Sequence, residues 1–127
     1  FPTLGDERGS LVALESHQSI PFDIKRVYCI FGTQKGVSRG FHAHKKLKQV
    51  AVCMVGSCRM VLDDGEQRED VFLDSAVKGL LIEDMVWREM HDFSDDCVLL
   101  VLASEHYDEA DYIRDYVDFL KVVTENV

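Results

Sequence analysis

Residues 36–56 of this chain read GVSRGFHAHKKLKQVAVCMVG, with two histidines one residue apart and a glycine at each end. Short runs rich in β-branched and aromatic residues between glycine-containing turns are typical of β-strands. Two strands are therefore predicted, over 39–44 and 47–55. Successive side chains of a strand point to opposite faces, so His42 and His44 share one face. Arg39 and Phe41 share the other face unless Gly40 hosts a bulge.

The same pattern continues on both sides of this segment. Turn signals separate short apolar runs, which favours an all-β sandwich or barrel over alternating strands and helices. Two-residue turns containing glycine predict hairpins at Gly56-Ser57 and at Asp64-Gly65. The predicted strands are 10–15, 25–31, 39–44, 47–55, 58–62, 67–73, 78–82, 86–91 and 97–103.

Only the C-terminal segment departs from the strand pattern. From Asp108 onward, Ile113, Tyr116, Val117 and Leu120 recur at helical spacing, which predicts one amphipathic helix closing over the sheet. The length of 127 residues is about one domain's worth, and no repeat or linker interrupts it. A single domain over 1–127 is therefore expected.

Composition narrows the class of protein. Apolar residues make up 46% and charged residues 29%, a globular balance that excludes disorder, collagen and coiled coil. The longest apolar runs are far shorter than the roughly 20 residues of a membrane helix, so no membrane partner is expected. Four cysteines lie in apolar stretches without a CxxC pair, which favours buried free thiols and the reducing cytoplasm.

Charge is distributed unevenly along the chain. From Ile24 to Leu62 there are eight Lys or Arg and no acid, while the remainder holds six basic and 23 acidic residues. An acidic protein repels nucleic-acid phosphates over most of its surface, so no nucleic-acid partner is expected. One basic stretch suits a small anion such as a phosphate or diphosphate. Arg26 and Arg39, in apolar or glycine-flanked settings, are the best candidates to bind it.

The pair His42 and His44 indicates chemistry. Two adjacent imidazoles are costly in a core, so an inward-facing pair would indicate a site, whereas a surface pair on an edge strand is the alternative. An imidazole has a pKa near neutrality and suits proton transfer. The isolated His17, His91 and His106 are expected to be ordinary surface or hydrogen-bonded residues.

The spacing resembles the first sequence motif of the cupin superfamily, carried here by Gly36, His42, His44, Gln49 and Gly56. This resemblance implies a jelly roll, or double-stranded β-helix. Cupins usually place glutamate at the position of Gln49 and histidine at that of Met90. An amide and a thioether are poor replacements for those metal ligands, so no metal cofactor is expected. The two histidines are then available as acid and base.

Longer runs carry a closer resemblance, which covers nearly the whole chain. They include GSLV at 9–12, IPFDIKRVY at 20–28, RGFHAHKK at 39–46, LDDG at 62–65, VWREM at 86–90, VLAS at 101–104 and DYIR at 111–114. The chain resembles the dTDP-4-keto-6-deoxyglucose 3,4-ketoisomerases. This resemblance implies a homodimer without cofactors that acts on a dTDP-linked keto-deoxysugar, in pathways to the 3-amino-3,6-dideoxyhexoses of bacterial surface polysaccharides.

The resemblance also implies roles for individual residues. His42 matches the catalytic base, His44 the second histidine that relays the proton, and Tyr28 a tyrosine of the site. Moving the ketone from carbon 4 to carbon 3 requires an enediolate, whose oxygens need hydrogen-bond donors. Arg26 and Arg39 match positions expected to bind the diphosphate. Two further residues are substrate-binding candidates: Gln49, which could hold a sugar hydroxyl, and Trp87, which either walls the pocket or packs in the core.

Two arginines bear on the configuration of the product at carbon 4. Arg8 resembles the galacto-forming members and Arg88 the gluco-forming members, so the two signals conflict. We favour the galacto product. Three other activities stay open at this point: a non-catalytic nucleotide-sugar-binding cupin, a metal-dependent cupin enzyme and a 3,5-epimerase.

Overall fold

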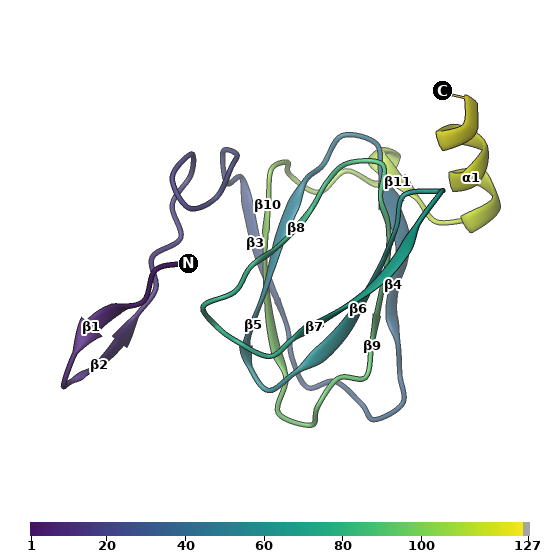
Figure 1. The fold of residues 1–127 in the computed structure, drawn as a ribbon. Coiled ribbons are helices and arrows are strands. Elements are labelled where there is room, and N and C mark those ends of the chain that lie inside the picture. Colours follow the sequence, from purple (N-terminus) through teal and green to yellow (C-terminus); the bar gives the residue numbers. More distant parts are fainter. Residues whose placement is uncertain (126–127) are drawn as a thin grey trace.

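The structure, a computed structural model that describes residues 1–125, contains two facing antiparallel β-sheets, an N-terminal hairpin and a C-terminal helix (Figure 1). The first sheet has the strand order β3 (Arg26–Ile30), β10 (Val98–Ala103), β5 (Gln49–Val55) and β8 (Leu80–Ile82). The second has the order β11 (Tyr112–Ile113), β4 (Arg39–His44), β9 (Trp87–His91), β6 (Cys58–Asp63) and β7 (Arg68–Leu73). The expected jelly roll is confirmed. Residues 126 and 127 of the predicted domain lie outside the described residues.

Strand β5 is apolar on both faces because both faces of its sheet are covered. Ala51 and Cys53 belong to the main core between the two sheets. Val50 and Val52 point the other way and pack against the N-terminal segment around Ile20. This double coverage explains why the sequence of the strand is a continuous apolar run rather than an alternating one.

Helix α1 (Tyr116–Glu125) packs on the outer face of the second sheet near one end of the barrel (Figure 1). Phe119 is fully buried there and packs with Trp87, Ala43 and Ile113. The predicted helical start at Asp108 is wrong. The chain first forms a 3₁₀ turn over Glu109–Asp111 and the short strand β11. Ile113 shares the spacing of the helical residues because it enters the same core from that strand, where it pairs with Ala43.

One predicted hairpin is correct and the other is not. Strands β6 and β7 pair as expected, with the turn centred on Gly65 and Glu66 because the Asp64 N–H donates to the Gln67 carbonyl at 3.2 Å. The Gly56-Ser57 turn instead carries the chain from one sheet to the other. Its Ser57 N–H donates to Ser94 Oγ at 2.9 Å, so it packs against a second turn rather than closing a ladder.

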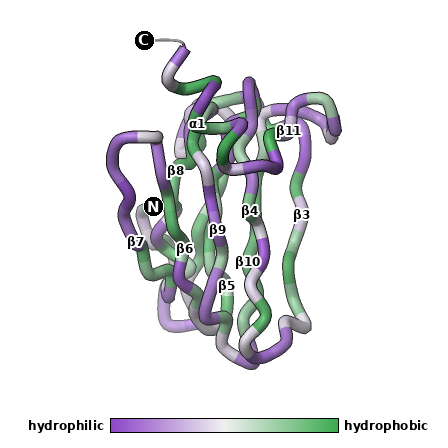
Figure 2. The backbone as a smooth tube through the Cα atoms, turned by 90° about the vertical axis from the view of Figure 1, so that its right-hand side faces the viewer, coloured by the Kyte–Doolittle hydropathy of each residue, from purple (hydrophilic) through white to green (hydrophobic). Residues whose placement is uncertain are grey.

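The predicted strand 10–15 is also wrong in extent. Strand β2 covers only Gly9–Leu11 and pairs with β1 (Leu4–Asp6), which the sequence did not predict. Both strands are fully exposed, and the hairpin projects away from the barrel (Figure 1). With no face to bury, neither strand carries the alternation on which prediction depends. Figure 2 shows a comparable hydrophilic stretch along the start of edge strand β7.

No helix within the described residues is long and apolar enough to cross a membrane. The remaining predicted strands 25–31, 39–44, 67–73, 78–82, 86–91 and 97–103 are found with small shifts of their ends.

Phe119 is the fully buried side chain on the face of α1 that packs against the sheet, so its truncation should destabilise the fold. We expect Phe119→Ala to lower the free energy of unfolding by about 3 kcal/mol, measured by urea denaturation. Val117→Ala, on the exposed face of the same helix, is the matched control and should change it by less than about 0.5 kcal/mol. Equal losses in the two variants would contradict the docking of α1.

Candidate active site

A β-bulge in strand β4 determines which side chains enter the barrel. Gly40 pairs with Glu89 and His42 with Arg88, so Phe41 is an extra residue without a partner on β9. Gly40 has a φ of 91° and Phe41 a φ of 57°. The bulge reverses the alternation between Arg39 and His42, and both line the same cavity. The sequence analysis expected Arg39 to face away from the histidines unless Gly40 hosts a bulge. The bulge is present, so Arg39 lies on the same face as His42.

A cavity of about 560 Å³ opens between β3, β4 and β11. Its polar lining includes Arg26 and Tyr28 from β3, Arg39 and His42 from β4, and Tyr112 and Arg114 from the C-terminal segment. The last two residues were not identified as site residues from the sequence. Both residues belong to the run DYIR at 111–114, which is one of the runs that resemble the ketoisomerase family.

The floor of the barrel interior is a chain of hydrogen bonds that links three strands. Arg88 Nη1 donates to Gln49 Oε1 at 2.6 Å, and Gln49 Nε2 donates to the Tyr28 hydroxyl at 3.0 Å. Arg88 Nη2 donates to the Val86 carbonyl at 2.9 Å. Arg88 is fully buried, and burial lowers its pKa to about 10, so the guanidinium stays charged at neutral pH. One fixed positive charge therefore sits inside the barrel.

The two histidines of β4 lie inside the barrel and are stacked edge to face, with ring centroids 4.9 Å apart. The ring of Tyr112 lies 4.9 Å from that of His42 and 4.3 Å from that of His44. His44 is fully buried and His42 is half-buried at the cavity wall. The surface-pair alternative is therefore wrong.

Asp111 orients His44. Its Oδ2 lies 3.2 Å from His44 Nδ1 and also accepts the Leu47 N–H, while Oδ1 accepts the Lys46 N–H at 2.9 Å. A carboxylate only accepts hydrogen bonds, so the proton of neutral His44 lies on Nδ1 and the lone pair on Nε2. The sequence analysis did not identify Asp111 as a site residue, because its contact with His44 joins positions 67 residues apart.

Burial is the main influence on the pKa values of the two histidines. Desolvation, followed by the charge of Arg88, lowers the pKa of His42 to about 4. The same two causes lower the pKa of His44 to about 2. Both imidazoles are therefore neutral at physiological pH and able to accept a proton. Burial also raises the pKa of Tyr28, which keeps its hydroxyl protonated and able to donate.

Four buried nitrogen atoms around this interior have no hydrogen-bond partner among the described residues: Arg26 Nε, His42 Nδ1, His44 Nε2 and Arg88 Nε. Buried polar atoms are normally satisfied, and unsatisfied ones concentrate where a ligand or water completes the site. Four of them around one interior therefore indicate a place for a polar ligand.

Several predicted site residues lie elsewhere. Arg8 is on the exposed N-terminal hairpin, paired with Asp6 at 2.6 Å, and the structure of one chain does not bring it to the cavity. Trp87 points outward, packs against Tyr116 and Phe119 under α1, and lines no part of the cavity. Its neighbour Arg88 enters the barrel because adjacent strand residues face opposite ways.

The remaining histidines lie away from the cavity. His91 Nε2 contacts Glu89 Oε1 at 2.9 Å and its Nδ1 contacts Ser38 Oγ at 2.7 Å. His17 and His106 are exposed. None of the three lines the cavity formed by β3, β4 and β11.

The residues present do not fit the metal ion that many cupins hold. Both amide atoms of Gln49 are already engaged, and the neighbouring Arg88 is itself a cation. Within the described residues, His42 and His44 belong to no group of three close His, Cys, Asp or Glu ligands. A divalent cation here would lack an anionic ligand and would be repelled by the guanidinium.

The depressed pKa values predict how stability depends on pH. Unfolded histidines titrate near their ordinary pKa of 6.5, so below that pH the unfolded chain binds more protons than the folded one and the free energy of unfolding falls. Between pH 7 and 5.5 each histidine should contribute a loss of about 1 kcal/mol. We measure the free energy of unfolding by urea denaturation at these pH values. It should fall less steeply with decreasing pH in His42→Asn than in the parent protein. Parallel slopes would contradict the assigned neutrality of His42.

The chain matches the FdtA family model, described as WxcM-like, C-terminal, over residues 1–124. It is 58% identical over 123 residues to the TDP-4-oxo-6-deoxy-alpha-D-glucose-3,4-oxoisomerase of Aneurinibacillus thermoaerophilus, with 97% of this chain and 88% of the relative covered. A likeness to the Mycobacterium tuberculosis rmlC epimerase, at 20% identity and a TM-score of 0.73 over 87% of this chain and 64% of that one, concerns the fold alone.

Two solved ketoisomerases are far more similar. The 3,4-ketoisomerase from Helicobacter canadensis has a TM-score of 0.95 and 49% identity, over 98% of this chain and 93% of that one. The sugar 3,4-ketoisomerase QdtA from Thermoanaerobacterium thermosaccharolyticum, solved in complex with TDP, has a TM-score of 0.96 and 45% identity, over 99% and 92%. Likeness in sequence and fold extends along the whole barrel, and this chain belongs to the FdtA family of TDP-sugar 3,4-ketoisomerases.

Proposed function

We propose that this ketoisomerase acts on dTDP-4-keto-6-deoxy-D-glucose and moves the keto group from carbon 4 to carbon 3 through an enediolate. The four unpartnered buried nitrogen atoms around one interior carry this proposal. They belong to two neutral imidazoles and two guanidinium groups, which together offer proton acceptors and hydrogen-bond donors. That combination suits a reaction in which a proton moves and negative charge appears on oxygen.

His42 is the base in this mechanism. It lines the cavity, and its imidazole is neutral at physiological pH because burial lowers its pKa to about 4. His42 removes the proton from carbon 3, and the electron pair of that bond forms the carbon–carbon double bond of the enediolate. The π pair of the carbon 4 carbonyl moves onto its oxygen, which gains a proton. Carbon 4 then gains a second proton, and the oxygen on carbon 3 loses its own proton as the new carbonyl forms. Substrate and product are isomers, so no oxidant or reductant is needed.

His44 relays protons between these positions. Its Nε2 carries a lone pair without a partner, and its ring stacks on that of His42. Asp111 is a positioning residue because it fixes the tautomer through Nδ1. The buried charge of Arg88 stabilises the enediolate electrostatically, and the Tyr28 hydroxyl, which accepts from Gln49, is free to donate to an enediolate oxygen.

Arg26 and Arg39 bind the diphosphate. Both line the cavity, and neither forms a salt bridge among the described residues. Arg114, at the same cavity, differs because Glu109 already holds its guanidinium through contacts of 2.7 and 2.9 Å. The two unpaired arginines are therefore the cations available to an anion of this size.

A homodimer in the cytoplasm is part of the proposal. Val27 and Phe31, in and just after edge strand β3, are 55% and 73% exposed, and Leu4 and Leu11 are exposed on the projecting hairpin. Apolar side chains at an edge strand favour association of two copies. The four cysteines are free, which fits a reducing compartment. The product would supply an aminotransferase on the way to a 3-amino-3,6-dideoxyhexose of a surface polysaccharide.

We keep the galacto configuration for the product. It rests on Arg8, which the fold of one chain does not bring to the cavity, while Arg88 is buried in the barrel interior and hydrogen-bonded to Gln49. Proton NMR of the product decides the matter: a small coupling between the protons on carbons 4 and 5 is expected. A large coupling would assign the gluco product instead.

The base assignment is tested by His42→Asn. We expect kcat to fall by about 100-fold or more, because general base catalysis contributes that much, while the protein stays folded and still binds TDP. The matched control is His91→Asn, on the outer side of neighbouring strand β9, which should keep the parent rate. An unchanged rate in His42→Asn would overturn the mechanism.

The reaction in deuterium oxide separates the other activities. A ketoisomerase should give product with deuterium on carbon 4, whereas a 3,5-epimerase would label carbons 3 and 5 and leave carbon 4 a ketone. A module that only binds the nucleotide sugar would label neither. Loss of activity on chelation, restored by a metal, would instead indicate a metal-dependent enzyme and contradict the proposal.

A further inference from the structure

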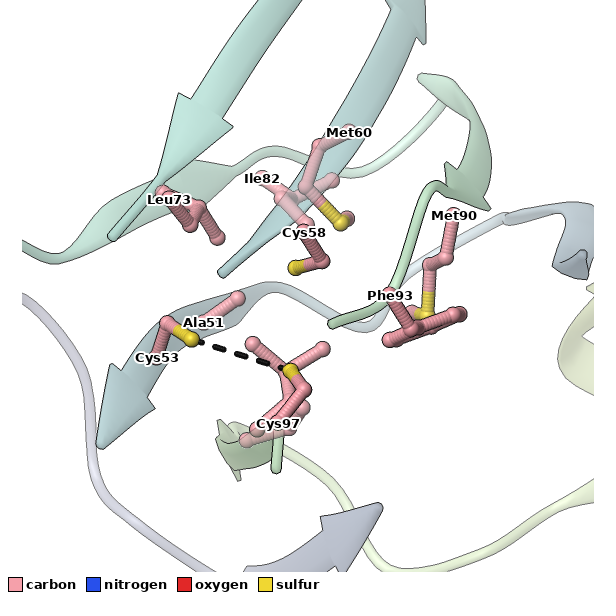
Figure 3. Packing of buried hydrophobic residues seen from close by; sticks show 11 residues of the cluster. Ala51, Cys53, Cys58, Met60, Leu73, Ile82, Met90, Phe93 and Cys97 are labelled. Carbon is pink, nitrogen blue, oxygen red and sulfur yellow. Dashed lines mark hydrogen bonds between the residues drawn. The ribbon is translucent and has the colours of Figure 1, made fainter. Parts of the chain in front are cut away.

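Three cysteines meet at the end of the barrel interior opposite the histidines. Cys53 lies near the end of β5, Cys58 begins β6, and Cys97 directly precedes β10. Their sulfur atoms all lie within 4.8 Å of one another, and the Sγ atoms of Cys53 and Cys97 are 3.7 Å apart. Figure 3 shows the three thiols turned toward a common centre. None of them lines the catalytic cavity.

The topology accounts for this convergence. The Gly56-Ser57 turn carries the chain between the sheets, so Cys53 and Cys58 face each other across the barrel. The antiparallel pairing of β5 with β10 places Leu99 opposite Cys53 and brings Cys97 alongside. The three sulfurs therefore come from three separate segments of two facing sheets. Ligands contributed from several directions can surround one ion, whereas ligands on a single strand cannot.

The spacing suits a small cation. A metal bound to sulfur at about 2.3 Å places two such sulfurs about 3.8–4.0 Å apart. The Cys53–Cys97 separation of 3.7 Å is already close to that value, and the other separations are below 4.8 Å. Small side-chain rotations that move each sulfur atom by well under 1 Å would therefore bring all three sulfurs to bonding distance from one ion.

The surroundings select a soft cation. All three thiols are at most 1% exposed, and their neighbours are apolar or sulfur-containing: Met60, Leu73, Ile82, Met90, Phe93 and Leu99. No histidine or carboxylate joins the sulfurs in the described residues, so hard cations lack the ligands they prefer. Zinc prefers four ligands, whereas a buried site with three sulfurs in apolar surroundings suits Cu(I).

We propose that Cys53, Cys58 and Cys97 form a buried three-sulfur site for Cu(I). This site is independent of the ketoisomerase mechanism. An ion bound there must displace the thiol protons, which favours a cation with high affinity for thiolate.

The experiment uses the full chain with Cys29→Ser, which removes the exposed thiol and leaves the three buried ones. The reduced protein is titrated anaerobically with Cu(I) in competition with a chromophoric Cu(I) chelator. One Cu(I) per chain should be retained, and its affinity should fall by more than about 100-fold in Cys58→Ala or Cys97→Ala. The matched control is Ile82→Val, which disturbs the same core without removing a sulfur and should keep the parent affinity.

X-ray absorption of the loaded Cys29→Ser protein keeps the proposal testable if the alanine variants do not fold. Three sulfur neighbours around copper support it, whereas nitrogen or oxygen neighbours overturn it. Equal retention of Cu(I) by the parent and by a folded Cys97→Ala variant also overturns it. So does retention of Zn²⁺ with higher affinity than Cu(I) in parallel competitions.

Discussion

The guanidinium of Arg88 is the constraint on which the interior depends. It is fully buried, and Gln49 and the Val86 carbonyl hold it inside the barrel by hydrogen bonds. A buried charge is costly unless it is hydrogen-bonded, and removing one of its partners would leave that cost uncompensated. The same charge contributes to the lowered pKa values of His42 and His44. One side chain thus places a fixed positive charge in the barrel and adds to the desolvation that keeps both imidazoles neutral.

The bulge at Phe41 supplies the second condition. Without the extra residue, Arg39 would lie on the face opposite His42, away from the cavity. Gly40 permits the bulge because a Cβ there would lie 3.2 Å from the Arg88 carbonyl oxygen, on a backbone with a φ of 91°. A single irregularity in β4 therefore brings Arg39 and His42, the proposed phosphate-binding cation and the proposed base, into one pocket.

Sequence reading was reliable where a local pattern determines the structure. The shared face of His42 and His44 and the hairpin after Asp63 could both be read from a few neighbouring residues. It failed where distant contacts decide. The packing of Ser57 against Ser94 turned a predicted hairpin into a crossover, and the core under α1 gave Ile113 a helical spacing on a strand. Trp87 packs in that core. The alternation of a strand shows which residues share a face, but not which of the two faces lines the barrel, so the sequence left the position of Trp87 open.

Desolvation has one consistent consequence throughout the barrel. It lowers the pKa of His42, at one end, and raises the pKa of Cys53, at the other, so each group is held in its neutral form. Arg88 is the exception because its ordinary pKa is so high that lowering it to about 10 leaves it charged. Among the described residues, Arg88 therefore supplies a permanent charge to the interior, at the end where the proposed enediolate would carry the opposite charge. The described residues place no such charge at the sulfur end, so the proposed Cu(I) ion would itself supply the positive charge there.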